Sequence, residues 1–217
     1  GKGAHVGLPK AFNGGELTTP ADAPDSVTYT VTELSESAMT IQIQYSGDQT
    51  WQYKFVKEGV ESNASITGDW KLAPMAAALG VGWDAANATG WWSNSADDVT
   101  TRACLFDDIF RFGEDGSFAN VMGSETWLEG WQGVDSDQCG TPVAPHDGSN
   151  AATYTHDAST GALVLTGKGA HVGLPKPFNG GELTTPADAP DSITYTVTEL
   201  SESAMTIQIQ YSGDQTW

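Results

Sequence analysis

The sequence predicts an all-β protein, an antiparallel meander barrel or sandwich with about eight strands per repeating module. Apolar and polar residues alternate through several segments that are joined by short turns, and only one short segment has a helical composition. An internal repeat indicates how the chain is organised into domains. Residues 1–51 and 167–217 are nearly identical, which gives the chain an internal repeat with a period of 166 residues.

The repeat is long enough to be a whole domain, because solenoid units have periods of only about 20 to 50 residues. The two copies differ at two positions, where Ala11 and Val27 of the first correspond to Pro177 and Ile193 of the second. Recently duplicated modules of this kind add length without adding new chemistry. We therefore expect a window from a longer tandem array.

Module boundaries are indicated in the middle of the chain. The strand-like "WQYKFVK" is followed by the polar stretch "EGVESNAS", and "ITGDWKLAP" then begins a new apolar pattern. We place the C-terminal part of one module at residues 1–58 and a linker at 59–64. The next module, which lacks its last strand, occupies 65–217.

Three hairpins are predicted from alternation around turns, in "DIFRFGEDGSFANVM" at 108–122, "ATYTHDASTGALVLTG" at 152–167 and "DSITYTVTELSESAMTIQIQY" at 191–211. The segment "APMAAALGVG" at 73–82 predicts a short helix that ends at its glycines. In "TWQYKFVK", Trp51 is the first of the alternating aromatic residues of a closing strand.

The second copy stops at Trp217, where the first continues into this closing strand, so we expect an unpaired sheet edge. Such an edge pairs with a strand from elsewhere, here the equivalent segment of the same or a neighbouring chain. One outcome is a circularly permuted module with a redundant copy, and the other is head-to-tail assembly. The expected complementing residues are Trp51, Gln52, Tyr53, Lys54, Phe55, Val56 and Lys57.

The composition excludes some classes of binding partner. Nine Lys and Arg against 28 Asp and Glu give a formal net charge of −19, which repels nucleic acid and anionic membrane surfaces. The 39% of hydrophobic residues can form a core. No run approaches the roughly 18 apolar residues of a membrane span, and residues 1–20 lack a signal-peptide pattern.

The two cysteines, Cys104 and Cys139, have neither a CxxC motif nor a histidine at zinc-ligand spacing. We expect one structural disulfide, with two free thiols in a reducing compartment as the alternative.

Five of the eight tryptophans lie between Trp83 and Trp131, beside acidic and amide side chains. Flat rings next to carboxylates can stack on sugars and hydrogen-bond their hydroxyl groups. Core packing beneath long loops is the alternative explanation. The candidate carbohydrate-binding residues are Trp91, Trp92, Trp127, Trp131, Glu125 and Glu129.

Acidic side chains suggest two further kinds of site. Glu125 and Glu129 with Asp107 and Asp108 could form the paired carboxylates of a glycosidase, but acids are abundant here and we do not expect an enzyme. Calcium is a candidate ligand of the acidic loops at 97–98, 107–108 and 135–137, although none has EF-hand spacing. No other cofactor is expected.

The triplet Gly68-Asp69-Trp70, followed by a meander, resembles the GxW opening of lipocalin-like barrels. More widely, "WKLAPMAAALGVG", "WWSNSADDVTTRACLFDDIFRF", "GSETWLEGWQG", "CGTPVAPHDGS" and "GKGAHVGLPKPFNGGELTTPADAPDSITYTV" resemble a module of large secreted or surface proteins of environmental Gram-negative bacteria. That module occurs in tandem or beside glycan-degrading domains. The resemblance implies an extracellular accessory module for glycan binding or surface display.

We therefore expect a structural repeat module of a large extracellular or cell-surface adhesin, stalk or filament, whose partners are neighbouring copies of itself. A carbohydrate-binding module that binds polysaccharide is the alternative.

Overall fold

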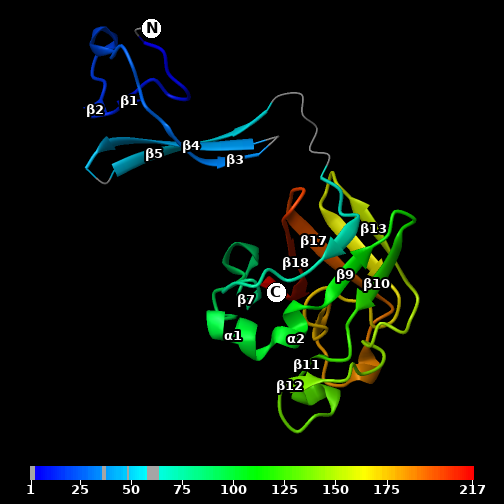
Figure 1. Ribbon diagram of the computed structural model, residues 1–217. Helices are drawn as coiled ribbons and strands as arrows, with labels where there is room; N and C mark the ends of the chain where they lie inside the picture. The colour runs from blue at the N-terminus through cyan, green and yellow to red at the C-terminus, as the bar shows by residue number, and fades with distance from the viewer. Residues whose placement is uncertain (1–2, 36–37, 48, 58–63) are drawn as a thin grey trace. The chain divides into compact units, whose positions relative to one another are not determined.

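The computed structural model describes residues 3–35, 38–47, 49–57 and 64–217, and the chain divides into two compact units. Unit 1 is Gly1–Asn63 and unit 2 is Ala64–Trp217 (Figure 1). The expected linker at 59–64 falls, apart from Ala64, outside the described residues.

Unit 1 is built on a three-stranded antiparallel sheet in the order β3-β4-β5. Ile41 and Ile43 point from β4 into its small core and are 3% and 1% exposed. The rings of β5 stack along one face, as the alternation in the sequence predicts. The elements are β1 (Ala11–Phe12), β2 (Gly15–Glu16), η1 (Pro20–Asp22), β3 (Thr30–Leu34), β4 (Ala38–Ser46) and β5 (Gln49–Val56).

Unit 2 is built on a curled seven-stranded antiparallel sheet that forms half of a barrel. Its order is β18-β17-β14-β13-β10-β9-β6, so β18 and β6 are the edges. Figure 1 shows β9 beside β10 in green, and β17 beside β18 toward the red C-terminal end. The strands are β6 (Gly68–Trp70), β9 (Ile109–Phe112), β10 (Ser117–Val121), β13 (Ala152–Asp157), β14 (Ala162–Thr166), β17 (Ser192–Leu200) and β18 (Met205–Gln208).

Short elements surround this sheet, and each small ladder has two strands. The ladders are formed by β7 (Gly80–Val81) with β8 (Trp92–Ser93), β11 (Thr126–Leu128) with β12 (Gln138–Gly140), β15 (Pro177–Phe178) with β16 (Gly181–Glu182), and β19 (Gln210–Ser212) with β20 (Gln215–Thr216). The helices are η2 (Ala85–Asn87), α1 (Ala96–Thr101), α2 (Ala103–Phe106), η3 (Gly130–Gln132) and η4 (Pro186–Asp188).

The main core lies on one face of the half-barrel sheet. Leu163 and Leu165 alternate on β14 and are fully buried, and Phe112 of β9 meets Phe118 of β10 edge to face. Side chains of one strand alternate between the two faces, so each hairpin contributes every second residue to this core.

The expected helix at 73–82 is wrong. This segment is irregular and ends in β7, and Ala77 has a φ of 59°, a left-handed conformation that no α-helix contains. The buried Asn94 side chain holds the segment open, since it accepts a hydrogen bond from Leu79 N and donates one to Met75 O. Tertiary hydrogen bonding outweighs the helical propensity of the alanines here.

The three expected hairpins are confirmed by β9–β10, β13–β14 and β17–β18, and the closing strand of the first copy is β5. The mostly β, antiparallel class is therefore confirmed, with a half-barrel as its main sheet. Among the described residues, no helix combines the length and apolar character that crossing a bilayer requires.

Candidate functional site

The repeated sequence forms the same local structure in both units. Asn13 and Asn179 each exchange two hydrogen bonds with a backbone 15 residues downstream. The indole of Trp51 donates to Glu16, and that of Trp217 donates to Glu182, both at 3.1 Å. This hairpin fold is therefore encoded within the repeat, and the two units differ in what surrounds it.

In unit 2 the second copy is covered by the residues that precede it. Leu174 is 3% exposed and packs with Leu105 and Trp127. The ring of His171 lies against those of Phe110 and His146, with centroids 6.4 and 5.8 Å away. The segment 64–166 thus supplies the cover for this face of the repeat.

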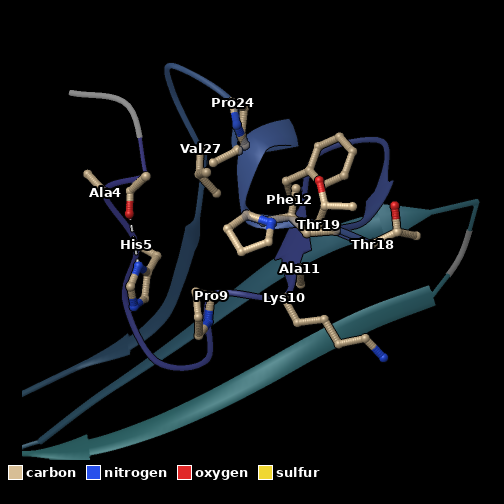
Figure 2. Close-up of a pocket in the computed structure, with 14 residues that line it drawn as sticks. Ala4, His5, Pro9, Lys10, Ala11, Phe12, Thr18, Thr19, Pro24 and Val27 are labelled. Carbon is tan, nitrogen blue, oxygen red and sulfur yellow. Dashed lines mark hydrogen bonds between the residues drawn. The ribbon is translucent and has the colours of Figure 1, made fainter.

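In unit 1 the same face is uncovered. Leu8, the counterpart of Leu174, is 56% exposed, and His5, the counterpart of His171, is also exposed. His5 lines a cavity of about 350 Å³ in this unit. Figure 2 shows His5 on one side of it and Phe12 on the other, while the side chain of Lys10 points away. The same repeat sequence therefore leaves an apolar leucine in solvent in unit 1 and buries it in unit 2.

At the closing strand it is unit 1 that is covered and unit 2 that is exposed. In unit 1, β5 pairs with β4 along its full length, and Thr40 and Ile41 are 4% and 3% exposed. In unit 2, β18 is the sheet edge, Thr206 is exposed and Ile207 is only partly buried. Within the described chain, β18 has no strand on its outer side.

A cavity of about 400 Å³ lies along this edge of unit 2. Residues 204–209, at β18, line it together with residues 70–73, 75 and 77–80. Tyr195 and Trp217 contribute aromatic surface to it. An apolar slot beside an unpaired edge is the arrangement that accepts an added β-strand.

Two of the candidate carbohydrate-binding tryptophans, Trp92 and Trp127, pack against the guanidinium group of Arg102. Trp127 is 6% exposed, and the guanidinium of Arg102 lies 4.7 Å from its ring centroid and 5.3 Å from that of Trp92. Arg102 also lies 3.9 Å from Asp98 of α1. This cation–π cluster ties α1 and α2 to β8 and β11 and leaves no open face of Trp127 for a sugar.

Trp131 is partly buried, donates to Glu129 at 3.0 Å and packs edge to face on His146. Trp91, in contrast, is 51% exposed and lies 6.5 Å from Trp83, which is 45% exposed. The exposed aromatic pair therefore includes Trp83, which is not among the binding residues predicted from the sequence. Its position among Asn, Gly and Asp residues was the available signal.

The acidic candidates occupy different environments. Asp107 and Glu125 are exposed, whereas Asp108 is 2% exposed and accepts a hydrogen bond of 2.6 Å from Thr126. Burial raises the pKa of Asp108 from 3.8 to about 7, and the bond from Thr126 acts in the opposite direction.

Two buried histidines lie in the same unit. Burial lowers the pKa values of His146 and His171 from 6.5 to about 4, so both rings are neutral at pH 7. His171 donates from Nδ1 to Gly169 O at 2.9 Å. These rings serve as packing surface between the repeat and its cover.

One carboxylate in each of the acidic loops considered for calcium, that of Asp98, Asp108 or Asp137, accepts a hydrogen bond from another part of the structure. Asp98 caps α1 through Ser95, and Asp137 accepts a hydrogen bond from Gly130 N. In the part of the chain that the structure describes, no three His, Cys, Asp or Glu side chains group as a metal site requires.

Cys104 and Cys139 form the expected disulfide, which joins α2 to β12 across 35 residues. Leu105, next to Cys104, packs into the same small core as Trp127 and Leu174. The disulfide therefore fixes the cover that lies over the second copy of the repeat.

Comparison with protein-family models, curated proteins and solved structures found no match to this chain.

Proposed function

We propose that the chain is a structural repeat module of a large extracellular adhesin, stalk or filament, in which neighbouring copies complete one another. Each unit has the structural element that the other unit lacks, and this supports the proposal. Unit 1 has the closing strand β5 but lacks cover over Leu8, and unit 2 has the cover over Leu174 but lacks a strand beside β18.

The exposure of Leu8 at 56%, against 3% for Leu174 in identical local sequence, carries the proposal. An apolar face that one copy buries and the other leaves in water is stabilised when a further copy of the segment 64–166 covers it. Identical modules repeated in this way extend a chain without creating new binding chemistry.

The Cys104–Cys139 disulfide supports the extracellular part of the proposal, since such bonds persist in oxidising compartments. The formal charge of −19 keeps a crowded surface polymer soluble.

The test adds a second copy of residues 64–166 in front of Gly1. The new junction, Thr166 followed by Gly1, reproduces the native step from Thr166 to Gly167. We expect amide hydrogen exchange in residues 3–31 to slow to the rates of residues 169–197. The matched control carries Phe112→Asp in the added segment, which buries a charge in its core. Unchanged exchange in residues 3–31 of the extended chain would contradict the proposal.

A carbohydrate-binding function is the second candidate, and the exposed pair Trp83 and Trp91 favours it. The two open rings lie 6.5 Å apart with their planes 57° from each other, so each offers a separate face on which a sugar ring can stack. Calorimetric titration with a panel of polysaccharides tests it. Binding that Trp91→Ala abolishes and Trp131→Ala preserves supports this function, and no binding to any polysaccharide rejects it.

A further inference from the structure

We propose that the facing rings of His146 and His171 form an acid-sensitive latch. The latch holds residues 143–150 against the start of the second repeat copy, residues 167–174, and opens when the rings gain protons. Both segments belong to unit 2. The latch therefore works whether or not copies of the chain associate, which takes it beyond the proposed function.

The two segments that the latch joins are packed directly on each other. A Cβ on Gly169 would overlap the carbonyl oxygen of Pro145, and Gly169 has a φ of 86°, a conformation that glycine adopts without strain. Asn150 donates from Nδ2 to Lys168 O at 3.0 Å. The start of the second copy is therefore held against this loop by backbone contact as well as by side chains.

The rings of His146 and His171 face each other across this contact. Their centroids lie 5.8 Å apart, and the two residues are 4% and 5% exposed. His171 also packs edge to face on Phe110 at 6.4 Å, and His146 packs in the same way on Trp131 at 5.6 Å. Each imidazole thus has an aromatic neighbour in addition to the other imidazole, and both are shielded from water.

This arrangement accommodates two neutral imidazoles but not two imidazolium ions. His171 Nδ1 donates to Gly169 O at 2.9 Å, whereas no hydrogen-bond partner among the described residues reaches His146 Nδ1. An imidazolium has a donor on both ring nitrogens, and two buried like charges at this separation repel each other. Burial accordingly lowers the pKa values of both rings from 6.5 to about 4, and a charge on His146 lowers that of His171 further.

The charged groups around the pair do not neutralise it. Asp147 favours the charged form of His146, but burial has the larger effect on the pKa, and the Asp147 carboxylate already accepts a hydrogen bond from Ser149 Oγ at 2.6 Å. Glu129 accepts one from the indole of Trp131. The other charged side chains on the segments packed against the pair are Arg111, which pairs with Asp69, Lys176, which pairs with Glu182, and Lys168, a cation that cannot pair with an imidazolium.

The counterpart of His171 in unit 1 shows that the repeat alone does not create the latch. His5 has the same local bond, from Nδ1 to Gly3 O at 3.0 Å, but its side chain is exposed. In unit 2, Phe110 and His146 of the preceding segment cover the equivalent ring. Sensitivity to acid therefore resides in the contact between the two segments and not in the repeated sequence.

The lowered pKa values define the pH range in which the latch opens. Stabilisation by the neutral rings is full above about pH 6.5 and is lost as the pH falls to about 4. Between pH 7 and pH 5, each ring that opening exposes should raise the equilibrium constant for opening about twentyfold. Opening breaks the bond from Val172 N to Tyr195 Oη, which is 3.0 Å long, so the Val172 amide reports on it.

Amide hydrogen exchange of the full chain at pH 7 and pH 5 tests the latch. After correction for the intrinsic effect of pH on exchange, the protection of Val172 should fall at least twentyfold. The protection of Leu163, in the middle of the sheet, should fall less, because complete unfolding also exposes Asp108, whose raised pKa acts in the opposite direction. His146→Phe keeps a ring in place and should reduce the fall at Val172 about twentyfold. The matched control, His156→Phe on β13, should leave it unchanged.

A second measurement uses the wild-type chain and applies even where His146→Phe does not fold. The Cε1–H resonances of His146 and His171, followed by NMR, should keep their neutral positions from pH 7 to pH 5. They should move only over the pH range in which Val172 loses its protection. Rings that gain protons while Val172 stays protected would overturn the latch. So would protection of Val172 that is the same at pH 7 and pH 5, or a fall that His146→Phe leaves unchanged.

Discussion

Leu8 and Leu174 occupy the same position of the repeat and offer the sharpest prediction about stability. Leu174→Ala removes carbon groups worth about 2.4 kcal/mol at ~0.8 kcal/mol each. The cavity left against Leu105 and Trp127 raises the cost to about 3–4 kcal/mol. Leu8→Ala acts on a side chain that is 56% exposed and should change stability by less than about 0.5 kcal/mol.

Thermal unfolding at a dilution where the chain is monomeric measures both variants. For a unit the size of residues 64–217, a loss of 3 kcal/mol lowers Tm by roughly 6–12 °C. Leu8→Ala should leave every transition in place. Equal losses for the two variants would refute the reasoning, because they would mean that both leucines are equally covered.

Three further outcomes are expected. Removing the disulfide with Cys104→Ala and Cys139→Ala should destabilise unit 2 by about 4 kcal/mol, from a closed loop of 35 residues, in urea unfolding. Burial raises the pKa of Asp108 to about 7, so the free energy of unfolding of the wild-type chain is highest below pH 3.8 and falls as the pH rises to about 7. Asp108→Asn removes this dependence. Relative to the wild type, the variant should therefore become more stable by up to about 4 kcal/mol between pH 4 and pH 8, as measured by urea unfolding at each pH. Asn94→Ala should cost about 3 kcal/mol, because buried backbone groups lose their partners, and Asn94→Asp should not restore it.

Local alternation predicted the hairpins well, because each strand's inward residues are set by its own two-residue period. The turn at Asp115 and Gly116 and the alternation of Ile193, Tyr195 and Val197 were sufficient for this. The segment 73–82 was mispredicted because its conformation depends on Asn94, which is distant in sequence.

The site was predictable only in part. The repeat identified Trp51–Lys57 as the closing segment of the first copy, of which the structure assigns residues up to Val56 to β5. Sequence could not separate the buried Trp127 from the exposed Trp91, because the side chains that cover Trp127, those of Arg102 and Leu174, lie far from it in the chain. Nor could it find the cavity beside β18, which is lined by segments more than 100 residues apart in the chain.

Amide exchange in the chain that carries a further copy of residues 64–166 in front of Gly1 tests the central claim most directly. Residues 3–31 should exchange as slowly as residues 169–197, because the added segment covers Leu8 as residues 64–166 cover Leu174. Exchange in residues 3–31 that the added segment leaves unchanged would contradict the account.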